Sequence, residues 1–329
     1  MTEPAKSSRL YDVLVTIGMI LATLVGLEIF LRIADFKEFR ESITERSLGY
    51  AYDSELGWAP VPNSTGTIKT FRTTQYQHNS IGLRDEEFSL DARSTIMFLG
   101  DSFVWGLDSQ ADERFTELLK PKLPDYKIVP AGVSGYGTDQ EYLLLQRLWP
   151  KIKPAVVVLI FCSQNDRLDS SSNIRYEDYQ KPYFATQPDG SLKLMNQPVP
   201  KSHILYIIDH WLVRNLWLAR MATNAYVRLR YPRLAVPDPS EKIVGMIRDF
   251  VVANGAKFMV GIQYHDEALT RYLEANNIPV AQLGGADFYT QGGWGPHWTP
   301  EGHQTVADRI LAMLRANGVV SRDAAAKSN

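Results

Sequence analysis

The stretch IMFLGDSFVWG, residues 96–106, decides the fold because it joins an apolar run to Gly100, Asp101 and Ser102. A short continuous apolar run that ends at a glycine is typical of a strand buried on both faces. In open α/β sheets, ligands gather beyond the carboxyl ends of the strands. The stretch therefore predicts a buried strand over residues 94–100 and marks Ser102 as a candidate functional residue.

Strands and helices alternate along the rest of the chain. Four further apolar runs are predicted strands: YKIVPAG (126–132), PAVVVLIFC (154–162), AKFMVGIQY (256–264) and IPVAQL (278–283). The predicted helices are RFTELLKPKL (114–123), TDQEYLLLQRLWPKI (138–152), SEKIVGMIRDFVVAN (240–254) and PEGHQTVADRILAMLRANG (300–318). Such alternation indicates an α/β fold with a doubly wound parallel sheet and helices on both faces.

Helix-boundary residues support two of these helices. Thr138 with Glu141 three residues later predicts a capping box at the start of one helix. Thr299 is the expected N-cap of the last helix, because Pro300 suits the first helical position, and Gly318 is its expected end.

The N-terminal segment from Leu10 to Phe36 is long and apolar enough to cross a membrane, which takes about 20 residues. Residues 13–27 carry no charge. Basic residues flank the segment on both sides, so the orientation signal is weak. Because no small-residue cleavage site follows, we expect an uncleaved signal anchor. A buried or interfacial amphipathic helix is the alternative.

These signals predict the domain organisation. The expected parts are a cytoplasmic tail (1–9), a transmembrane anchor (10–36), a juxtamembrane linker with a small β extension (37–93), the α/β domain (94–318) and a disordered tail (319–329). The α/β domain contains an insertion at 170–239, whose helical part at 203–232 is apolar and aromatic. Charges in that part exclude a second membrane span. It packs on the core, covers the site as a lid, or lies on the membrane.

Composition narrows the classes of partner. The net charge of −2 and the absence of a clustered basic face argue against a nucleic-acid partner. The single cysteine, Cys162, excludes an internal disulfide and a cysteine-rich metal site.

Chemically useful groups follow several of the predicted strands. Ser102 follows the first strand, and the glycine-rich segment AGVSGYG (131–137) follows the second. Asn165 follows the third strand, and His297 precedes the last helix. A hydroxyl, exposed backbone N–H groups, an amide and an imidazole at one sheet edge are the parts of acyl transfer.

In these blocks the chain resembles the SGNH (GDSL-type) hydrolases. The first block is Gly100-Asp101-Ser102, the second Gly135, the third Asn165-Asp166 and the last His297 in HWTPEGH. The resemblance covers roughly residues 94–316, apart from the insertion. It implies a flavodoxin-like three-layer sandwich and a serine hydrolase without a metal or organic cofactor.

The resemblance also implies roles for individual residues. Ser102 is the nucleophile that forms an acyl-enzyme, and His297 is the general base. The backbone N–H groups of Ser102 and Gly135, together with the side chain of Asn165, form the oxyanion hole. The strand ends at Ser102 so that the hydroxyl stands clear of the sheet.

One feature departs from the family pattern. The family usually places an aspartate two or three residues before the histidine, but Trp294 and Gly295 stand there. Asp287 is the expected orienting acid if the chain folds back; otherwise a main-chain carbonyl or water orients His297. The aromatic residues next to the blocks pack in the core or stack on a sugar ring: Trp105, Tyr136, Trp294 and Trp298.

The expected function is therefore that of a membrane-anchored serine esterase. It would hydrolyse O-acyl esters, with O-acetyl as the leading candidate, on an acylated small molecule or an envelope or exported polysaccharide. The domain would face the periplasm or the outside of a single-pass inner-membrane protein. Alternatives are a lipid esterase or thioesterase, a sugar O-acyltransferase, and a non-catalytic glycan-binding or assembly protein that retains the fold.

Overall fold

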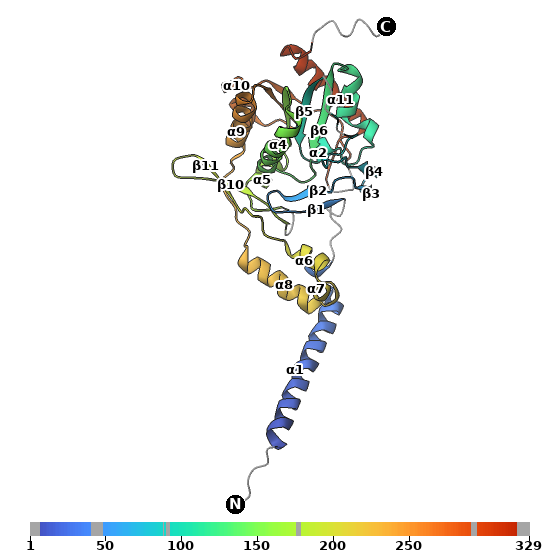
Figure 1. The fold of residues 1–329 in the computed structure, drawn as a ribbon, viewed down its shortest axis with the longest axis vertical. Coiled ribbons are helices and arrows are strands. Elements are labelled where there is room, and N and C mark those ends of the chain that lie inside the picture. Colours follow the sequence, from blue (N-terminus) through green and yellow to red (C-terminus); the bar gives the residue numbers. More distant parts are fainter. Residues whose placement is uncertain are drawn as a thin grey trace, which may run out of the picture. The chain divides into compact units, whose positions relative to one another are not determined.

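In a computed structural model of the chain, the described residues are 7–40, 49–87, 89, 93–175, 179–290 and 295–320. The chain forms two compact units, and each is described by itself (Figure 1). One comprises Met1–Ser42 with Lys201–Arg233, and the other Ile43–Pro200 with Leu234–Asn329. The helical part of the predicted insertion thus shares a unit with the N-terminal segment.

A five-stranded parallel sheet forms the centre of the larger unit. Its strands are β5 (Ser94–Gly100), β6 (Tyr126–Gly132), β7 (Val156–Phe161), β12 (Lys257–Ile262) and β13 (Val280–Gln282). The strand order is β13-β12-β7-β5-β6. Numbered along the chain, this is the flavodoxin-like order 2-1-3-4-5. The strand β6 is added on one side of β5, and β7, β12 and β13 are added on the other, so the direction of strand addition reverses between β5 and β7. The predicted doubly wound sheet is confirmed, and the reversal marks the sheet edge where a ligand site is expected.

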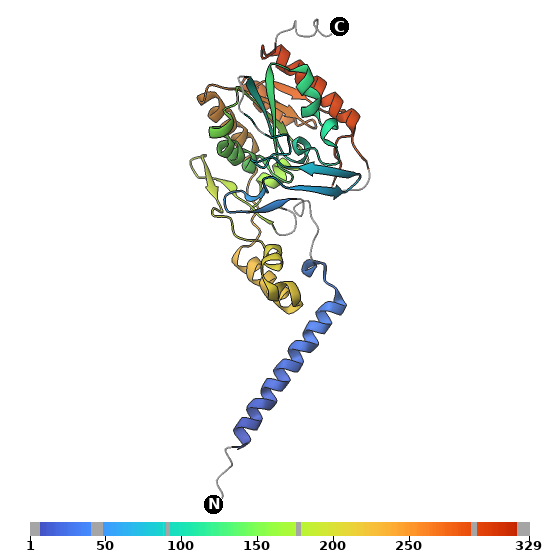
Figure 2. The ribbon, with the colours of Figure 1, turned by 45° about the vertical axis from the view of Figure 1, so that its right-hand side comes forward.

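Helices cover both faces of the sheet, which confirms the three layers (Figure 2). On one face lie α3 (Phe115–Leu119) and α11 (Pro300–Ala316). On the other lie α4 (Thr138–Ile152) and α9 (Ser240–Ala253), while α10 (Glu267–Ala275) joins β12 to β13. Short 3-10 turns at Ala111–Glu113 (η3) and Lys120–Lys122 (η4) flank α3.

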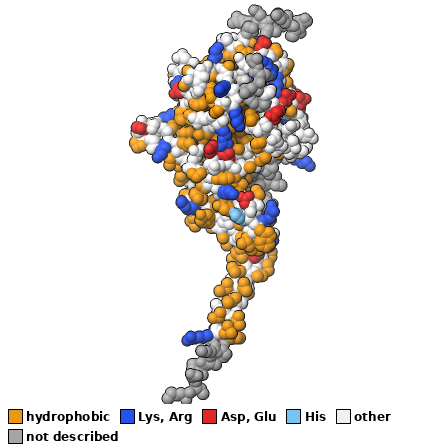
Figure 3. Space-filling model, viewed as in Figure 1, with side chains coloured by type: hydrophobic (Ala, Val, Ile, Leu, Met, Phe, Trp, Pro, Cys, Tyr) orange, Lys and Arg blue, Asp and Glu red, His pale blue; other side chains and the backbone are white. Residues whose placement is uncertain are grey.

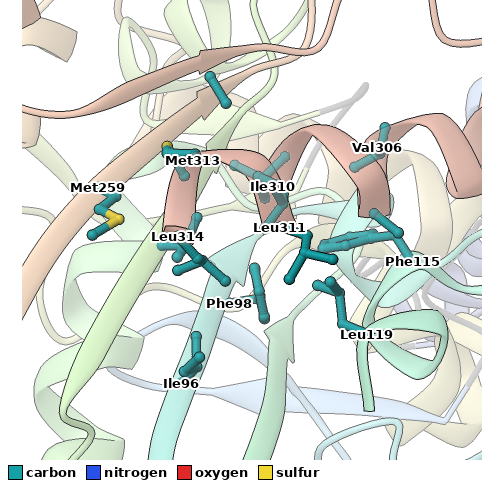
Figure 4. Packing of buried hydrophobic residues seen from close by; sticks show 14 of the residues in the cluster. Ile96, Phe98, Phe115, Leu119, Met259, Val306, Ile310, Leu311, Met313 and Leu314 are labelled. Atoms are coloured by element: carbon teal, nitrogen blue, oxygen red, sulfur yellow. The ribbon is translucent and has the colours of Figure 1, made fainter. Parts of the chain in front are cut away.

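The core between the sheet and α11 explains why the strands read as continuous apolar runs. Ile96 and Phe98 of β5 pack with Phe115 of α3 and Ile310 of α11, all with exposed fractions of 0% (Figure 4). Strands covered on both faces bury every side chain, so no polar alternation appears in their sequence.

The cap of α11 is confirmed, but that of α4 is wrong. Thr299 caps α11, since its hydroxyl accepts from the N–H of Gly302 at 3.1 Å. The N-cap of α4 is Gly137 instead of Thr138, whose Oγ is buried without a hydrogen-bond partner among the described residues. One half of a capping box is present, because the N–H of Gly137 donates to the Oε1 of Gln140 at 3.4 Å.

Four small antiparallel hairpins surround the sheet. β1 (Tyr50–Asp53) and β2 (Gly57–Pro60) pair within the region expected to be linker, which corrects that expectation. β3 (Thr65–Lys69) and β4 (Thr73–Gln77) confirm the predicted β extension. The insertion adds β8 (Ile174–Arg175) with β9 (Tyr179–Gln180), and β10 (Tyr183–Thr186) with β11 (Leu192–Met195).

The smaller unit consists of helices. It contains α1 (Ser7–Ala34), a 3-10 turn η1 (Lys37–Phe39), α6 (His203–Asp209), α7 (Trp211–Asn215) and α8 (Trp217–Arg230). Residues Arg9–Ala34 of α1 are long and apolar enough to cross a membrane, with a mean hydropathy of 2.3 in their most apolar part. Such a helix fits a membrane anchor or a signal sequence.

Candidate active site

The end of β5 is built so that Ser102 starts a helix at the sheet edge. Helix α2 (Ser102–Trp105) begins directly after Asp101, whose carboxylate accepts from the N–H of Phe103 at 2.9 Å. Gly100 and Gly132 let this helix lie close to β5 and β6. A Cβ on Gly132 would stand 2.3 Å from the nitrogen of Trp105, so any side chain there would displace α2.

The structure brings Ser102 and His297 together. The Oγ of Ser102 lies 2.8 Å from the Nε2 of His297, and both side chains are buried. His297 is held by an antiparallel bridge between Phe288 and Trp298, and its carbonyl accepts from the N–H of Tyr289 at 2.9 Å. The two residues come from opposite ends of the α/β domain, so the sheet topology brings them together.

A carboxylate lies on the far side of the imidazole, and it belongs to Asp108. Its Oδ2 is 3.4 Å from the Nδ1 of His297, which also lies 3.2 Å from the carbonyl oxygen of Gly295. Two acceptors beside Nδ1 favour the tautomer with its proton there, which leaves Nε2 to accept from Ser102. The geometry is that of a Ser-His-Asp set.

Asp108 corrects the expectation placed on Asp287. Asp287 is exposed, and its backbone carbonyl accepts from the N–H of Thr299 at 3.0 Å. Asp108 returns to the site because α2 is only four residues long and the chain then turns through Gly106 (φ 81°) and Asp108 itself (φ 66°). The signal in the sequence was the motif WGLD, since glycine and aspartate tolerate the left-handed conformation.

The carboxylate of Asp108 is fixed by the tip of the β3–β4 hairpin. Its Oδ1 accepts from the hydroxyl of Thr70 and, at 3.2 Å, from the N–H of Phe71. Burial alone would raise the pKa of Asp108, but donors from His297 and Thr70 outweigh burial and hold the pKa below its ordinary value. Asp108 is therefore an ionised carboxylate beside the imidazole.

The three expected oxyanion donors follow neighbouring strands. Gly135 (φ 80°) lies in the loop after β6. This loop begins at Val133, whose N–H donates to the carbonyl of Gly100 at 3.1 Å. The Nδ2 of Asn165 donates to Asp101 at 3.0 Å, which leaves its second N–H for another acceptor. Within the described part of the chain, the backbone N–H groups of Ser102 and Gly135 have no hydrogen-bond acceptor.

Buried acidic side chains, here called the acidic cluster, lie behind the nucleophile. The members are Asp101, Asp139, Glu141, Asp166 and Asp169. Asp166 begins α5 (Asp166–Ser170), and its Oδ2 accepts from the N–H of Cys162 at 2.7 Å. Burial, reinforced by neighbouring carboxylates, raises the pKa of Glu141 and of Asp166 well above their ordinary values. Burial likewise raises the pKa of Asp169, to about 7.

Three of the four aromatic residues expected near the substrate are buried in the core, which corrects the idea that they stack on a sugar. Trp105 donates to the Nε2 of His78 at 3.2 Å, and the hydroxyl of Tyr136 donates to the carbonyl of Trp58. Trp298 is fully buried between the sheet and α11. Trp294 lies outside the described residues.

An exposed aromatic pair that the sequence did not indicate lies near the Asp108 carboxylate. Phe71, 44% exposed, stacks on Tyr289 with ring centroids 4.2 Å apart. The hydroxyl of Tyr289 lies 3.2 Å from Arg72, which forms an ion pair with Glu113 at 2.6 Å. Because the N–H of Phe71 donates to Asp108, the pair borders the site.

The remaining candidate groups are structural. Cys162 is buried and lies 2.8 Å from Gln263, and burial raises the pKa of its thiol well above the ordinary value. His303 accepts from the N–H of Phe115 at 3.2 Å, and burial lowers its pKa to about 3. Among the described residues, no three His, Cys, Asp or Glu side chains form a group able to hold a metal ion.

Comparison with known proteins gives matches in structure only. No protein-family model matches the sequence, and no curated protein matches it. A putative lipolytic protein of the G-D-S-L family from Desulfitobacterium hafniense is 10% identical over 68% of this chain and all of its own, with a TM-score of 0.40. TesA is 15% identical over 68% of this chain and 99% of its own (TM-score 0.38).

A third solved structure is Axe2, an acetylxylan esterase from Geobacillus stearothermophilus. It is 10% identical over 69% of this chain and 97% of its own, with a TM-score of 0.38. In the order of its parallel strands, and in the GDS, Gly135, Asn165 and His297 blocks at one sheet edge, the chain resembles the SGNH (GDSL-type) hydrolases.

Proposed function

We propose that this protein is a serine esterase that works through an acyl-enzyme. The observation that carries the proposal is the line of three groups, in which Ser102 lies 2.8 Å from His297 and His297 lies 3.4 Å from Asp108. A serine hydroxyl becomes a useful nucleophile when a positioned base removes its proton. Axe2, one of the similar solved structures, is an acetylxylan esterase, which agrees with this activity.

The proposed reaction has two half-reactions. His297 takes the proton of Ser102 as Oγ attacks the ester carbonyl carbon, and the resulting oxyanion is held by the N–H groups of Ser102, Gly135 and Asn165. The intermediate collapses to the acyl-enzyme as the alcohol leaves with the proton from His297. Water then attacks the acyl carbon with His297 as base, which releases the acid and restores Ser102.

Labelling of the full-length protein by a fluorophosphonate probe tests the proposal. The probe phosphonylates only activated serines, so wild type should label, while Ser102→Ala and His297→Ala should not. Ser109→Ala is the matched control, because Ser109 is also a buried serine, but its hydroxyl has no hydrogen-bond partner among the described residues. Absence of labelling in folded wild type would favour a non-catalytic glycan-binding protein.

For the substrate, we propose an O-acylated polysaccharide, with acetyl as the acyl group. The support is the exposed Phe71–Tyr289 pair, since an aromatic face beside a site suits the apolar face of a sugar ring. The β3–β4 hairpin that presents Phe71 also lines a cavity of about 670 Å³, to which Thr65, Thr67 and Gln75 contribute hydroxyl and amide groups and Asp112 a carboxylate. Hydroxyl, amide and carboxylate groups can all hydrogen-bond to the hydroxyls of a glycan.

Phe71→Ala tests the substrate class. It should raise the KM for an O-acetylated polysaccharide several-fold, while hydrolysis of p-nitrophenyl acetate, which has no glycan, should be unchanged. Phe71→Tyr keeps the aromatic face and is the matched control. Equal effects of Phe71→Ala on both substrates would point to a disturbed Asp108 and count against the glycan.

We also propose that α1 anchors the protein in the inner membrane, with the α/β domain facing the periplasm. The length and apolar composition of Arg9–Ala34 support a span. Protease added to spheroplasts should cleave the domain, and protection of the domain until lysis would reverse the orientation.

A further inference from the structure

Helix α8 of the smaller unit is amphipathic, but its apolar stripe is exposed and its buried face contains polar residues. At 100° per residue, Ala222, Ala225, Tyr226 and Leu229 form one stripe roughly 100° wide. All four are exposed, Leu229 by 85% and Tyr226 by 56%. The opposite face, with Arg220, Asn224 and Val227, is buried. A helix on the surface of a soluble protein turns its apolar stripe toward the protein core. An outward apolar stripe therefore needs a membrane or another protein to cover it.

The buried Arg220 of α8 has backbone acceptors, whereas the Oδ1 of the buried Asn224 has no hydrogen-bond partner among the described residues. The guanidinium of Arg220 donates to the carbonyls of Val213 at 2.9 Å, Phe39 at 2.6 Å and Arg214 at 2.5 Å. These bonds fix α8 against α7 and the residues after α1. The apolar stripe is therefore held outward.

Neighbouring helices extend the exposed apolar surface. Together the residues form what is here called the apolar face: Ile208 of α6, Trp211 and Leu212 of α7, and Ala222, Ala225, Tyr226 and Leu229 of α8. Trp211 is 72% exposed. Figure 3 shows hydrophobic side chains over these helices, with Lys and Arg beside them. A contiguous surface of this kind marks an interaction site.

The start of α8 is fixed to the end of the apolar helix α1. The carboxylate of Glu28 accepts from the N–H groups of Trp217 at 3.0 Å and Leu218 at 2.9 Å, which caps α8. Arg32 donates to the carbonyl of Asn215 at 2.6 Å. If α1 spans a bilayer, its uncharged residues 13–27 occupy the hydrocarbon, so Glu28 and the start of α8 lie at the headgroup level.

Charge in this segment suits an anionic surface. Residues 201–233 contain a single acidic residue, Asp209, and these basic residues: Lys201, Arg214, Arg220, Arg228, Arg230 and Arg233. Arg228 and Arg230 flank Leu229 on either side of the stripe. Basic side chains beside an apolar stripe with Trp and Tyr are typical of helices that lie in the membrane interface.

We infer that the apolar face of α6–α8 lies on the surface of the bilayer that α1 spans, with anionic phospholipid headgroups as its partner. Tyr226 and Leu229 enter the boundary between headgroups and acyl chains, and the flanking arginines contact phosphates. The smaller unit is then a two-part membrane module, with one helix across the bilayer and one along it. This inference does not depend on the esterase activity.

Spin-label accessibility on the full chain tests the inference. Leu229→Cys and, as the matched control, Val252→Cys on α9 of the larger unit are each labelled with a nitroxide; Val252 is also an exposed aliphatic residue, at 58%. The native thiol of Cys162 is buried, so only the introduced cysteine reacts. Each protein is reconstituted in vesicles of phosphatidylethanolamine and phosphatidylglycerol, and collisions with oxygen and a water-soluble nickel complex are measured.

The label at Leu229 should collide several-fold less with the nickel complex, and more with oxygen, than the label at Val252. Equal access of nickel to both labels would overturn the inference. Protection of Leu229 from both reagents would also overturn it, because protein then covers the stripe. Dipolar broadening between labels would identify that protein as a second copy. Because the labels are small and both labelled positions are exposed, we expect both variants to fold like wild type.

Discussion

Buried carboxylates on the two sides of Ser102 have pKa values that are shifted in opposite directions. On one side, donors from His297 and Thr70 outweigh burial and keep the pKa of Asp108 below its ordinary value. On the other, crowding in the acidic cluster adds to burial and raises the pKa of Glu141 and Asp166. Burial is common to both sides, but donors outweigh it at Asp108, whereas neighbouring carboxylates add to it at Glu141 and Asp166.

The largest expected effect is on the Asp108 side. Asp108→Asn removes the charge that positions the imidazole and stabilises it once protonated, so kcat should fall about 10³–10⁴-fold with little change in KM. Steady-state hydrolysis of p-nitrophenyl acetate measures both constants. Asp287→Asn is the control and should have no effect, because Asp287 is exposed. If Asp287→Asn is the damaging change, the comparison fails.

The acidic cluster contains one fully buried cation, and its loss should destabilise the fold. The Nζ of Lys181 contacts Asp139 and donates to the carbonyl of Asp169 at 2.9 Å, with both side chains of the ion pair 0% exposed. Lys181→Met should lower the free energy of unfolding by about 3–5 kcal/mol, since it leaves a buried carboxylate without its partner. Urea denaturation followed by circular dichroism measures this loss.

A double variant sharpens the same point. Lys181→Met with Asp139→Asn removes the charges together and should recover much of the lost stability. A double variant no more stable than Lys181→Met would mean that packing, and not charge, makes Lys181 necessary.

A smaller effect is expected at Glu141, whose two carboxylate oxygens have no hydrogen-bond partner among the described residues. Because its folded pKa is raised, the folded state holds the proton more tightly than the unfolded one. Wild-type stability should then decline as the pH rises above the ordinary pKa of 4.5, by at most about 1.4 kcal/mol per pH unit. Glu141→Gln should flatten that decline, which urea titrations between pH 5 and 8 would measure. An unchanged slope would show that Glu141 is ionised.

The sheet was predictable because its strands are buried on both faces. Residues 96–99, 128–131 and 156–161 are uninterrupted apolar runs, as expected for strands of a parallel sheet that is covered on both faces. Ser102, Asn165 and His297 could be singled out for the same reason, since each stands after a strand or before a helix with a clear boundary. Local pattern and proposed function coincide at those positions.

Asp108 was missed because its contacts with His297, Thr70 and Phe71 form only in the tertiary structure. Nothing in residues 106–108 shows that Thr70 and Phe71, more than 30 residues earlier, will fix the carboxylate. The orientation of Trp105 and Tyr136 was equally hidden, because adjacency in sequence does not reveal which way a side chain points. The cap at Gly137 differed because a glycine can begin a helix without a side-chain acceptor.

The short turn after α2 places the nucleophile and its acid within one stretch of seven residues, 102–108. The distance between Ser102 and Asp108 is thus set by local backbone geometry, independently of the loop that presents His297. The segment before His297 has to hold the imidazole in place, as the Phe288–Trp298 bridge and the Gly295 carbonyl do, but it does not have to carry the acid as well. The histidine and its carboxylate partner can accordingly change independently, by evolution or by an engineer seeking a new acceptor.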